Sequence, residues 1–370
     1  MPGAAKSGTG DMKAPIVPFF ISHRGCPHRC VFCDQEKISG AAGSIPSADR
    51  ILERIREYRR TSGLPAVEVA FFGGSFTSLP HSTQESLLVP LQPLLATGEV
   101  SSVRLSTRPD SIDASRVEFL RRMGVSTVEI GVQSMDDEVL SIAGRGHDAA
   151  DVERAFSLLH EQGLSVGAQL MPGLPGDTAE KSLGTLTRVL DLGPAFIRIY
   201  PALVIAGTGL AQLFAQGTYQ PLSLGAAISL CKVMLHRSLL RGTPVIRIGL
   251  QPTADLQRPG TVLAGPWHPA FRQLVEAELF YDLVSRLLGG QASEGMYATV
   301  VCNPSRVSDV VGQGRANRVR FLREQGVRIE GVRGDPAFSR HEVAVLLPGE
   351  NRRGDLFSNL KYSTKEACHD

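Results

Sequence analysis

The chain has 370 residues, of which 42% are hydrophobic, and its formal net charge is +2 at pH 7. The length predicts a large core domain with an appended unit, and the composition is ordinary for a globular protein. The small, polar first fifteen residues lack the apolar run of a secretory signal, and no apolar stretch of about 18 residues appears. We therefore expect a cytoplasmic protein with no membrane partner.

Short apolar runs alternate with stretches of helical spacing over the first two hundred residues. The apolar runs span residues 16–22, 67–72, 103–106, 127–132, 165–171 and 196–200, and the helical stretches span 48–60, 82–95, 113–123, 148–162 and 178–190. This alternation predicts right-handed βαβ units and a parallel sheet. Six strands are too few for a closed eight-stranded barrel, so we expect an α/β fold built on a partial (β/α)6 TIM-type barrel at residues 15–204.

The alternation weakens from about residue 205. Helical stretches at residues 226–240, 270–288 and 317–325 are interleaved with short strands at 245–248, 298–302, 327–332 and 342–347. This pattern predicts a smaller α/β appendage at residues 205–353. We expect flexible tails at residues 1–14 and 354–370.

Unusual motifs follow five of the predicted barrel strands. They are the cysteines from Cys26, the Gly73-Gly74-Ser75 turn, the segment 106–110, the Gln133-Ser134 pair and the turn 172–176. In TIM-type barrels the chemistry takes place at the carboxyl ends of the strands. The positions of the motifs therefore predict one functional rim.

Three cysteines, Cys26, Cys30 and Cys33, lie within eight residues with the spacing C-x3-C-x2-C. A disulfide framework is not expected in a cytosolic chain, whereas thiolates suit an iron–sulfur cluster or zinc. Structural zinc normally has four protein ligands, which His23 or His28 could complete. A three-cysteine [4Fe–4S] site would instead leave one iron open, as a catalytic metal requires.

The spacing, with Phe32 before the last cysteine, resembles the radical S-adenosylmethionine superfamily. The resemblance implies that the open iron binds the amino and carboxylate groups of S-adenosylmethionine. The reduced cluster then cleaves this cofactor to methionine and a 5′-deoxyadenosyl radical, which abstracts hydrogen from a substrate. The resemblance also places Phe32 near the adenine and implies an electron donor of the flavodoxin or ferredoxin type.

Two further motifs agree with this resemblance. Gly73, Gly74 and Ser75 stand where the superfamily has a Gly-Gly-Glu-like motif for the amino group of the cofactor, although a plain strand-to-helix turn would look the same. The GVQS segment ending at Ser134, with the RGH segment starting at Arg145, resembles the GxQS…RGH signature. That signature belongs to the branch of oxygen-independent coproporphyrinogen oxidase and the Elongator catalytic subunit.

The resemblance to this branch assigns roles to four more residues. Gln133 and Arg145 would contact the ribose and the carboxylate of the cofactor. Gln169 stands where many relatives have Asp for the ribose hydroxyls, and Ser106 stands where Elongator-type relatives often have Glu. An amide can still hydrogen-bond a hydroxyl, so Gln169 remains a candidate, with a core amide as the alternative.

The sequence does not identify the substrate. Residues 305–353 contain ten Arg, no Lys and six acidic residues, which suits an RNA partner contacted through Arg315, Arg318 and Arg320, or else a solvated charged face. A small metabolite is the other candidate substrate. His268 as an acid or base and Cys302 as a hydrogen-atom donor are further candidates, each with a packing role as the alternative.

Two other classes of function stay open. One relative of the coproporphyrinogen oxidase branch acts as a haem chaperone and keeps the cluster, so a haem-binding protein is one alternative. A zinc-stabilised structural protein is the other, and it leaves the motifs at the strand ends unexplained.

Overall fold

The computed structural model of the chain describes residues 14–39, 45–289 and 296–367. Residues 1–13 of the predicted N-terminal tail and 368–370 of the predicted C-terminal tail lie outside this part. The chain divides into two compact units that interleave along the sequence and differ from the predicted domains. The first unit takes in the described residues of Met1–Pro27, Ser39–Gly131 and Asp151–Val166, and the second those of His28–Ile38, Val132–Ala150 and Gly167–Asp370.

The first unit contains neighbouring parallel strands of one β-sheet. They are β1 (Ile16–Phe20), β2 (Val67–Phe72), β3 (Val100–Thr107) and most of β4 (Val125–Gln133), each paired with the next. Alternate residues such as Val69, Phe71 and Leu105 are fully buried, as expected where helices cover one face. The helices are α2 (Ala48–Ser62), α3 (His81–Leu88), α4 (Gln92–Ala96), α5 (Ala114–Arg122) and most of α7 (Ala149–Glu161).

Helix α2 illustrates how the local sequence sets an element. The Ser47 side chain accepts a hydrogen bond from the backbone N–H of Arg50, which caps the helix at its start. Ile51 and Ile55, four residues apart, are buried on one side of the helix, which packs on β1 and β2. Gly63 ends the helix in the left-handed conformation, with φ of 67°.

The second unit contributes β5 (Ser165–Leu170, from Gly167 on), β6 (Phe196–Ile199) and β8 (Val245–Ile248), which pair in parallel. In the described part of the chain, these strands and those of the first unit make one seven-stranded sheet in the order β1-β2-β3-β4-β5-β6-β8. The predicted partial TIM-type α/β barrel is confirmed. The strand count needs one correction, because β8, assigned to the appendage from the sequence, pairs with β6 of the barrel.

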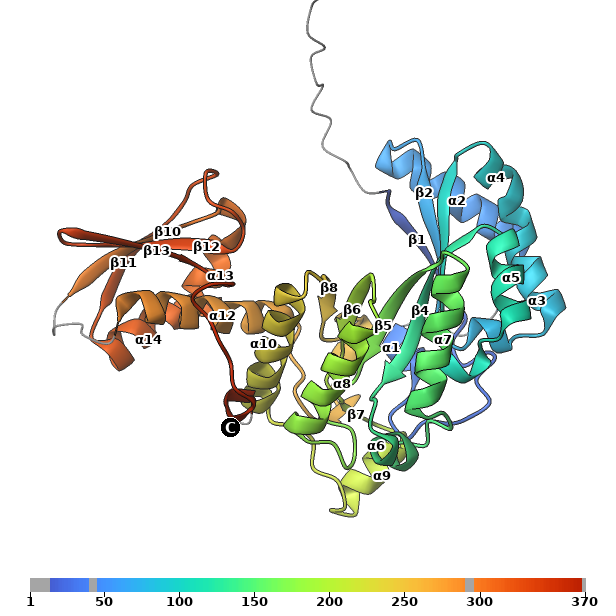
Figure 1. Ribbon diagram of the computed structural model, residues 1–370. Coiled ribbons are helices and arrows are strands. Elements are labelled where there is room, and N and C mark those ends of the chain that lie inside the picture. The colour runs from blue at the N-terminus through green and yellow to red at the C-terminus, as the bar shows by residue number, and fades with distance from the viewer. Residues whose placement is uncertain (1–13, 40–44, 290–295, 368–370) are drawn as a thin grey trace, which may run out of the picture. The chain divides into compact units, whose positions relative to one another are not determined.

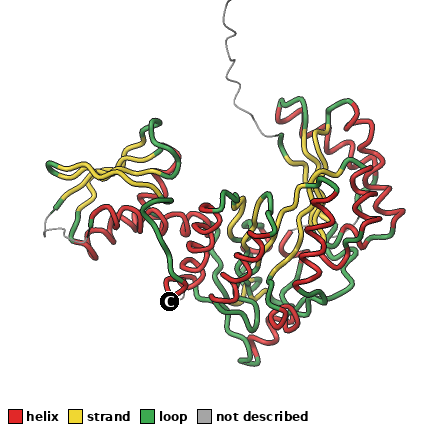
Figure 2. The backbone as a smooth tube through the Cα atoms, viewed as in Figure 1, coloured by secondary structure: helices red, strands yellow, loops and turns green. Residues whose placement is uncertain are grey.

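Helices and short strands complete this part of the second unit. They are α1 (Gln35–Ser39), α6 (Asp137–Ile142), α8 (Ala179–Asp191), α9 (Gly209–Ala215), α10 (Leu224–Leu240), α11 (Ala254–Gln257), β7 (Val204–Ile205) and β9 (Val262–Ala264). Strands β7 and β9 pair with each other in antiparallel orientation. Figure 2 shows the alternation of strand and helix along the chain. Among the described residues, no helix is both long and apolar enough to span a bilayer.

The C-terminal part of the second unit has a sheet of its own in the order β11-β10-β12-β13 (Figure 1). Its strands are β10 (Tyr297–Cys302), β11 (Arg328–Gly334), β12 (Glu342–Leu347) and β13 (Glu350–Asp355), and its helices are α12 (Phe271–Leu288), α13 (Val307–Val311) and α14 (Ala316–Gln325). Val300, Val343 and Val345 are fully buried, so this sheet has its own core.

The flexible tail predicted from residue 354 is corrected for residues 354–367. Leu356 and Leu360 are buried, and the Tyr362 hydroxyl donates to Asp282 of α12 at 2.7 Å. The Nε2 atom of His236, in α10, lies 2.8 Å from the carbonyl oxygen of Leu356. Apolar burial together with these hydrogen bonds offsets the conformational entropy that a free tail would keep.

Candidate functional site

The segment before Cys26 packs against the turn after β2 in the first unit. The Ser75 N–H donates to the Arg24 carbonyl oxygen at 2.9 Å. A Cβ atom on Gly25 would come 2.2 Å from the Ser75 carbonyl oxygen, and one on Gly74 would come 2.3 Å from that of Arg24. Both glycines have positive φ. The chain can therefore bring these two segments together only because both positions lack a side chain.

The Ser75 side chain is fully buried. Its Oγ lies 3.0 Å from Thr107 Oγ1 and 3.1 Å from Ser78 Oγ, and Thr107 Oγ1 lies 2.6 Å from Thr77 Oγ1. These hydroxyls tie the end of β2 to the end of β3. The Ser75 hydroxyl is thus enclosed within this network, and its predicted contact with the cofactor stays a prediction.

Ser106 is half-buried near the end of β3 and pairs in register with Glu129 of β4. The same face of β3 carries Arg104, which donates to Glu68 at 2.9 and 3.1 Å and to Glu129 at 3.1 Å. Burial alone would lower the pKa of Arg104, but hydrogen bonds and charges from the two carboxylates raise it. Ser106 therefore lies beside a charged network on the face opposite the buried Leu105.

The RGH segment holds the cysteine loop in the second unit. The Val31 N–H donates to the Ala143 carbonyl oxygen at 3.1 Å, and a Cβ atom on Gly146 would lie 2.4 Å from the His28 ring. Arg145 is only 6% exposed, and its Nη1 donates to Cys30 Sγ at 3.2 Å. Two motifs that are separated by more than a hundred residues thus meet at one sulfur atom.

Gln133 has a strained backbone at the end of β4, with φ of 67°. A non-glycine residue in this region costs about 1–3 kcal/mol, and such residues gather at functional sites. Its carbonyl oxygen accepts from the Met171 N–H at 2.9 Å, and its Oε1 lies 3.4 Å from Gln169 Nε2, a long contact. His147 Nε2 lies 3.3 Å from the carbonyl oxygen of Val132. The structure therefore brings Gln133, Gln169 and the RGH segment together.

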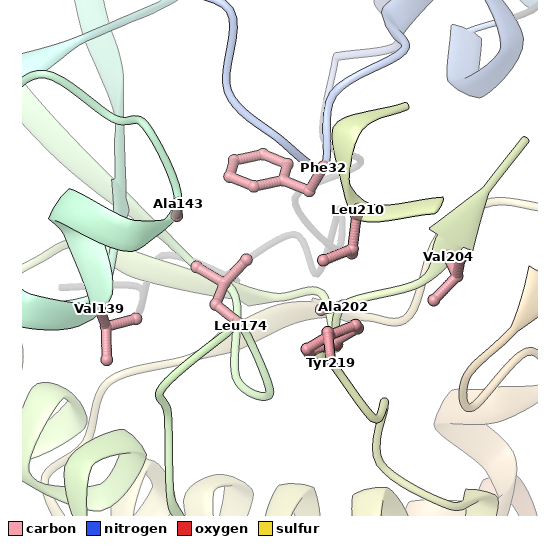
Figure 3. Close-up of a cluster of buried hydrophobic side chains, with 8 residues drawn as sticks. All are labelled: Phe32, Val139, Ala143, Leu174, Ala202, Val204, Leu210 and Tyr219. Carbon is pink, nitrogen blue, oxygen red and sulfur yellow. The ribbon is translucent and has the colours of Figure 1, made fainter. Parts of the chain in front are cut away.

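Phe32 is 7% exposed and packs in an apolar cluster with Leu174 of the turn after β5, whose residues 173–176 read GLPG and which we call the GLPG turn. Figure 3 shows its ring above Leu174, between Ala143 and Leu210. This aliphatic surrounding gives the ring a packing role in the cysteine loop, in addition to the adenine contact predicted for it.

Tyr219 of the same cluster fixes the GLPG turn. Burial, with a smaller effect from the Asp177 carboxylate, raises the pKa of Tyr219. The hydroxyl therefore stays protonated and donates to the Gly173 carbonyl oxygen at 2.6 Å. The same glycine is held by Asp177, whose Oδ2 accepts from the Gly173 N–H at 2.8 Å.

The segment after β7 supports the cysteine loop. The sequence gave no indication of this support. Lys37 Nζ donates to the Ala206 carbonyl oxygen at 2.6 Å and pairs with Asp34 at 2.8 Å. The Leu210 N–H donates to the Val31 carbonyl oxygen at 2.6 Å. A lone lysine and a backbone amide carry no sequence signal, so this support could not be found from the pattern of residues.

His268 and Cys302 occupy structural positions. His268 Nδ1 accepts from the Ala270 N–H at 3.1 Å, just before α12 begins. Cys302 is fully buried in the C-terminal sheet, and burial raises the pKa of its thiol to about 11. The catalytic roles suggested for His268 and Cys302 from the sequence stay predictions.

The donor set of the cysteine loop fits an iron–sulfur cluster. Cys30 and Cys33 lie in the second unit, joined by a turn in which the Cys33 N–H donates to the Cys30 carbonyl oxygen at 3.1 Å, and Cys26 lies in the first. Within the described residues, no three His, Cys, Asp or Glu side chains gather as a ready metal site. Thiolates are nevertheless the ligands of such clusters, and hydrogen bonds to ligand sulfurs are one of the factors that set cluster potentials.

Comparisons with known proteins agree with these features. Residues 20–188 match the family described as the radical SAM superfamily, and residues 194–280 match the radical SAM C-terminal domain. The chain is 28% identical to an uncharacterized protein of Methanocaldococcus jannaschii, over 58% of this chain and 69% of that protein. It is 29% identical to the tRNA uridine(34) acetyltransferase of the same organism, over 56% of this chain and 46% of that protein.

Elongator-type proteins are also similar. The chain is 29% identical to Elongator complex protein 3 of Bos taurus, over 71% of this chain and 55% of that protein. Among solved structures, Elp3 of Methanocaldococcus infernus with an N-terminal deletion has a TM-score of 0.56 at 21% identity, over 72% of this chain and 62% of that one, which shows a shared fold. The chain spans about half the length of the curated acetyltransferases and Elongator proteins it matches.

Proposed function

Because the chain belongs to the radical SAM superfamily, and is thus an enzyme with a [4Fe–4S] cluster and S-adenosylmethionine as cofactors, we propose that it modifies a tRNA at a C–H bond. The substrate class is supported by the relatives named for tRNA uridine(34) acetylation. The superfamily requires a reductant, and we propose one of the flavodoxin or ferredoxin type in the cytoplasm. Bound together, the cluster and S-adenosylmethionine supply a radical that removes a hydrogen atom from the substrate.

The contact between Arg145 and Cys30 carries the assignment of the site. We propose Cys26, Cys30 and Cys33 as the cluster ligands, because three thiolates leave one iron free for the cofactor. The buried guanidinium of Arg145 would lie close to the cluster and could form a charge-assisted pair with the cofactor's carboxylate.

Other residues orient the cofactor in this proposal. Gln133 and Gln169, whose side-chain amides lie next to each other, would hydrogen-bond the ribose hydroxyls. Ser106 would contribute a further hydroxyl. Gly73 and Gly74 would present backbone groups to the amino group, and Phe32 would border the adenine.

Cofactor cleavage and tRNA modification are tested in one anaerobic assay. The protein is reconstituted with iron and sulfide, reduced with dithionite and given S-adenosylmethionine, with and without tRNA transcripts. We expect 5′-deoxyadenosine by mass spectrometry, and a changed nucleoside mass after digestion of the tRNA. A Cys30→Ala variant should lose both products. Deoxyadenosine without any change in the tRNA would reject the tRNA substrate and leave a small metabolite as the candidate.

The haem and zinc alternatives gain no support. The superfamily match accounts for the cysteine spacing, and His28, one of the residues that could complete a zinc site, has its ring packed beside Gly146. A protein that shows no deoxyadenosine with a fully loaded cluster, but a haem absorption band on titration, would favour the haem-binding function instead.

A further inference from the structure

The two faces of the C-terminal sheet differ in what covers them. Helices α12, α13 and α14 pack on one face, where Val300, Cys302 and Val345 are fully buried, and Figure 1 shows α12 and α14 on the same side of the sheet. The opposite face carries Tyr297, whose side chain is among the exposed large hydrophobic groups at 51%. Thr299 follows it on the same face and is half-buried.

Strand register places two arginines on this uncovered face. Arg328 pairs with Tyr297, and Arg333 pairs with Val301, along the parallel strands β11 and β10. Directly paired residues of neighbouring strands point to the same side of a sheet. Both arginines are exposed.

A bulge in β11 places Arg328 and Arg333 on the same face of the sheet. Ile329 pairs with Ala298, but the next β10 residue pairs with Gly331, so Glu330 is an extra residue. Without it, Arg328 and Arg333, five positions apart, would point to opposite faces because side chains alternate along a strand. Bulges re-aim side chains in this way and are typical of functional edges of sheets.

Of the three arginines predicted from the sequence to contact RNA, Arg318 and Arg320 make contacts within the domain, whereas Arg315 is exposed. Arg318 donates to the Ile329 carbonyl oxygen at 2.8 Å and thus holds β11 in place. Arg320 pairs with Glu278 and lies 3.8 Å from the centre of the Tyr281 ring. Both groups thus hold parts of the domain together, and the positive charge of Arg320 is matched by a carboxylate.

Two acidic residues on the uncovered face, Glu342 and Asp355, have hydrogen-bond partners of their own. Glu342 accepts from Arg353 at 3.0 Å, and Asp355 accepts the backbone N–H groups of Phe357 and Ser358 at 2.8 and 2.9 Å. Arg328 and Arg333 add two positive charges to this face, next to the exposed ring of Tyr297.

We propose that the face formed by Tyr297, Arg328 and Arg333 docks a single-stranded segment of RNA. Aromatic rings on open sheets stack on bases, and guanidinium groups pair with phosphates, so the ring and the two charges complement the two parts of a nucleotide chain. The inference rests on the proposed function, since it supplies a docking surface for the tRNA on which the enzyme would act.

The test measures RNA binding by the full-length holoenzyme. Fluorescence anisotropy with a labelled tRNA transcript is recorded for the wild type, Tyr297→Ala, Tyr297→Phe and the double variant Arg328→Gln/Arg333→Gln. The double variant Arg154→Gln/Arg323→Gln removes the same charge from exposed helix positions and is the matched control, since the side chains of Arg154 and Arg323 are 64% and 68% exposed. Circular dichroism checks that every variant is folded.

We expect Tyr297→Ala to weaken binding about tenfold, and Tyr297→Phe to bind like the wild type, because stacking needs the ring and not the hydroxyl. The double variant of the face should lower the slope of log K against log salt concentration by about 1.4, as for two phosphate contacts on a single strand. The control should keep the wild-type slope within about 0.5.

Equal binding by the face variants and the wild type would overturn the docking surface. Turnover on tRNA would still stand in that case, because deoxyadenosine formation and tRNA modification are read in a separate assay. A face variant that changes only self-association, seen by light scattering, would also overturn it and assign the face to a second copy of the chain.

Discussion

Arg145 Nη1 donates a hydrogen bond to Cys30 Sγ at 3.2 Å. The donor comes from the RGH segment and the acceptor from the cysteine loop, and the guanidinium is almost completely buried. A hydrogen bond to a cluster sulfur stabilises the reduced, more negative cluster relative to the oxidised one. With Cys30 as a ligand, as we propose, Arg145 should therefore affect the cluster as well as the cofactor.

Replacing Arg145 tests this effect on the reduction potential. We expect Arg145→Gln to shift the midpoint potential of the reconstituted cluster to more negative values by several tens of mV, since about 59 mV corresponds to tenfold in a one-electron equilibrium. Arg145→Lys, which keeps the charge, should shift it less. The measurement is a redox titration followed by electron paramagnetic resonance, with Arg154→Gln as the control. Identical potentials in all variants would show that the hydrogen bond does not form in the loaded protein.

The left-handed backbone of Gln133 predicts that glycine at this position gives a more stable protein than alanine, the reverse of the usual order. Alanine normally stabilises a chain relative to glycine, but at positive φ its Cβ costs about 1 kcal/mol. We expect Gln133→Gly to unfold with a free energy about 1 kcal/mol higher than Gln133→Ala, as measured in urea on the cluster-free protein. The opposite order would mean that the backbone at Gln133 is not in the left-handed region.

Gly25 is expected to tolerate no side chain. Gly63 also has positive φ, but nothing lies near its Cβ position, whereas a Cβ on Gly25 would meet the Ser75 carbonyl oxygen at 2.2 Å. Gly63→Ala should therefore cost only the backbone strain of about 1 kcal/mol. Gly25→Ala should cost more and lower the iron content after reconstitution. Equal stabilities and iron contents for the two variants would contradict the close approach of these segments.

Thiol reactivity should separate the cysteines of the loop from those of the core. Cys231 and Cys302 are fully buried, and burial raises the pKa of both thiols, to about 11 for Cys302. Since the thiolate is the reactive form, neither should react with iodoacetamide at about pH 8 in the folded, cluster-free protein. Cys26, Cys30 and Cys33 are only partly buried and should react. Peptide mass spectrometry gives the sites, and labelling of Cys302 before unfolding would contradict its buried position.

The sequence alone determined the barrel strands and the motifs that follow them. The β2 run at residues 67–72 and the helical spacing after it coincide with the structure because alternation and helical periodicity are local properties of a chain. The cysteine spacing and the RGH segment are likewise read within a few residues, so the family and its cofactors followed from the sequence.

Tertiary structure decided which of these residues meet. The pairing of β8 with β6, the contact of Arg145 with Cys30 and the support of the cysteine loop by Lys37 join residues that lie far apart in the chain. The roles of the arginines also depend on the fold. Arg318 and Arg328 look alike in the sequence, but one holds a strand and the other faces solvent, because the packing of α14 and the register of β11 with β10 set their directions. Charge and spacing do not carry that information, whereas register and burial do.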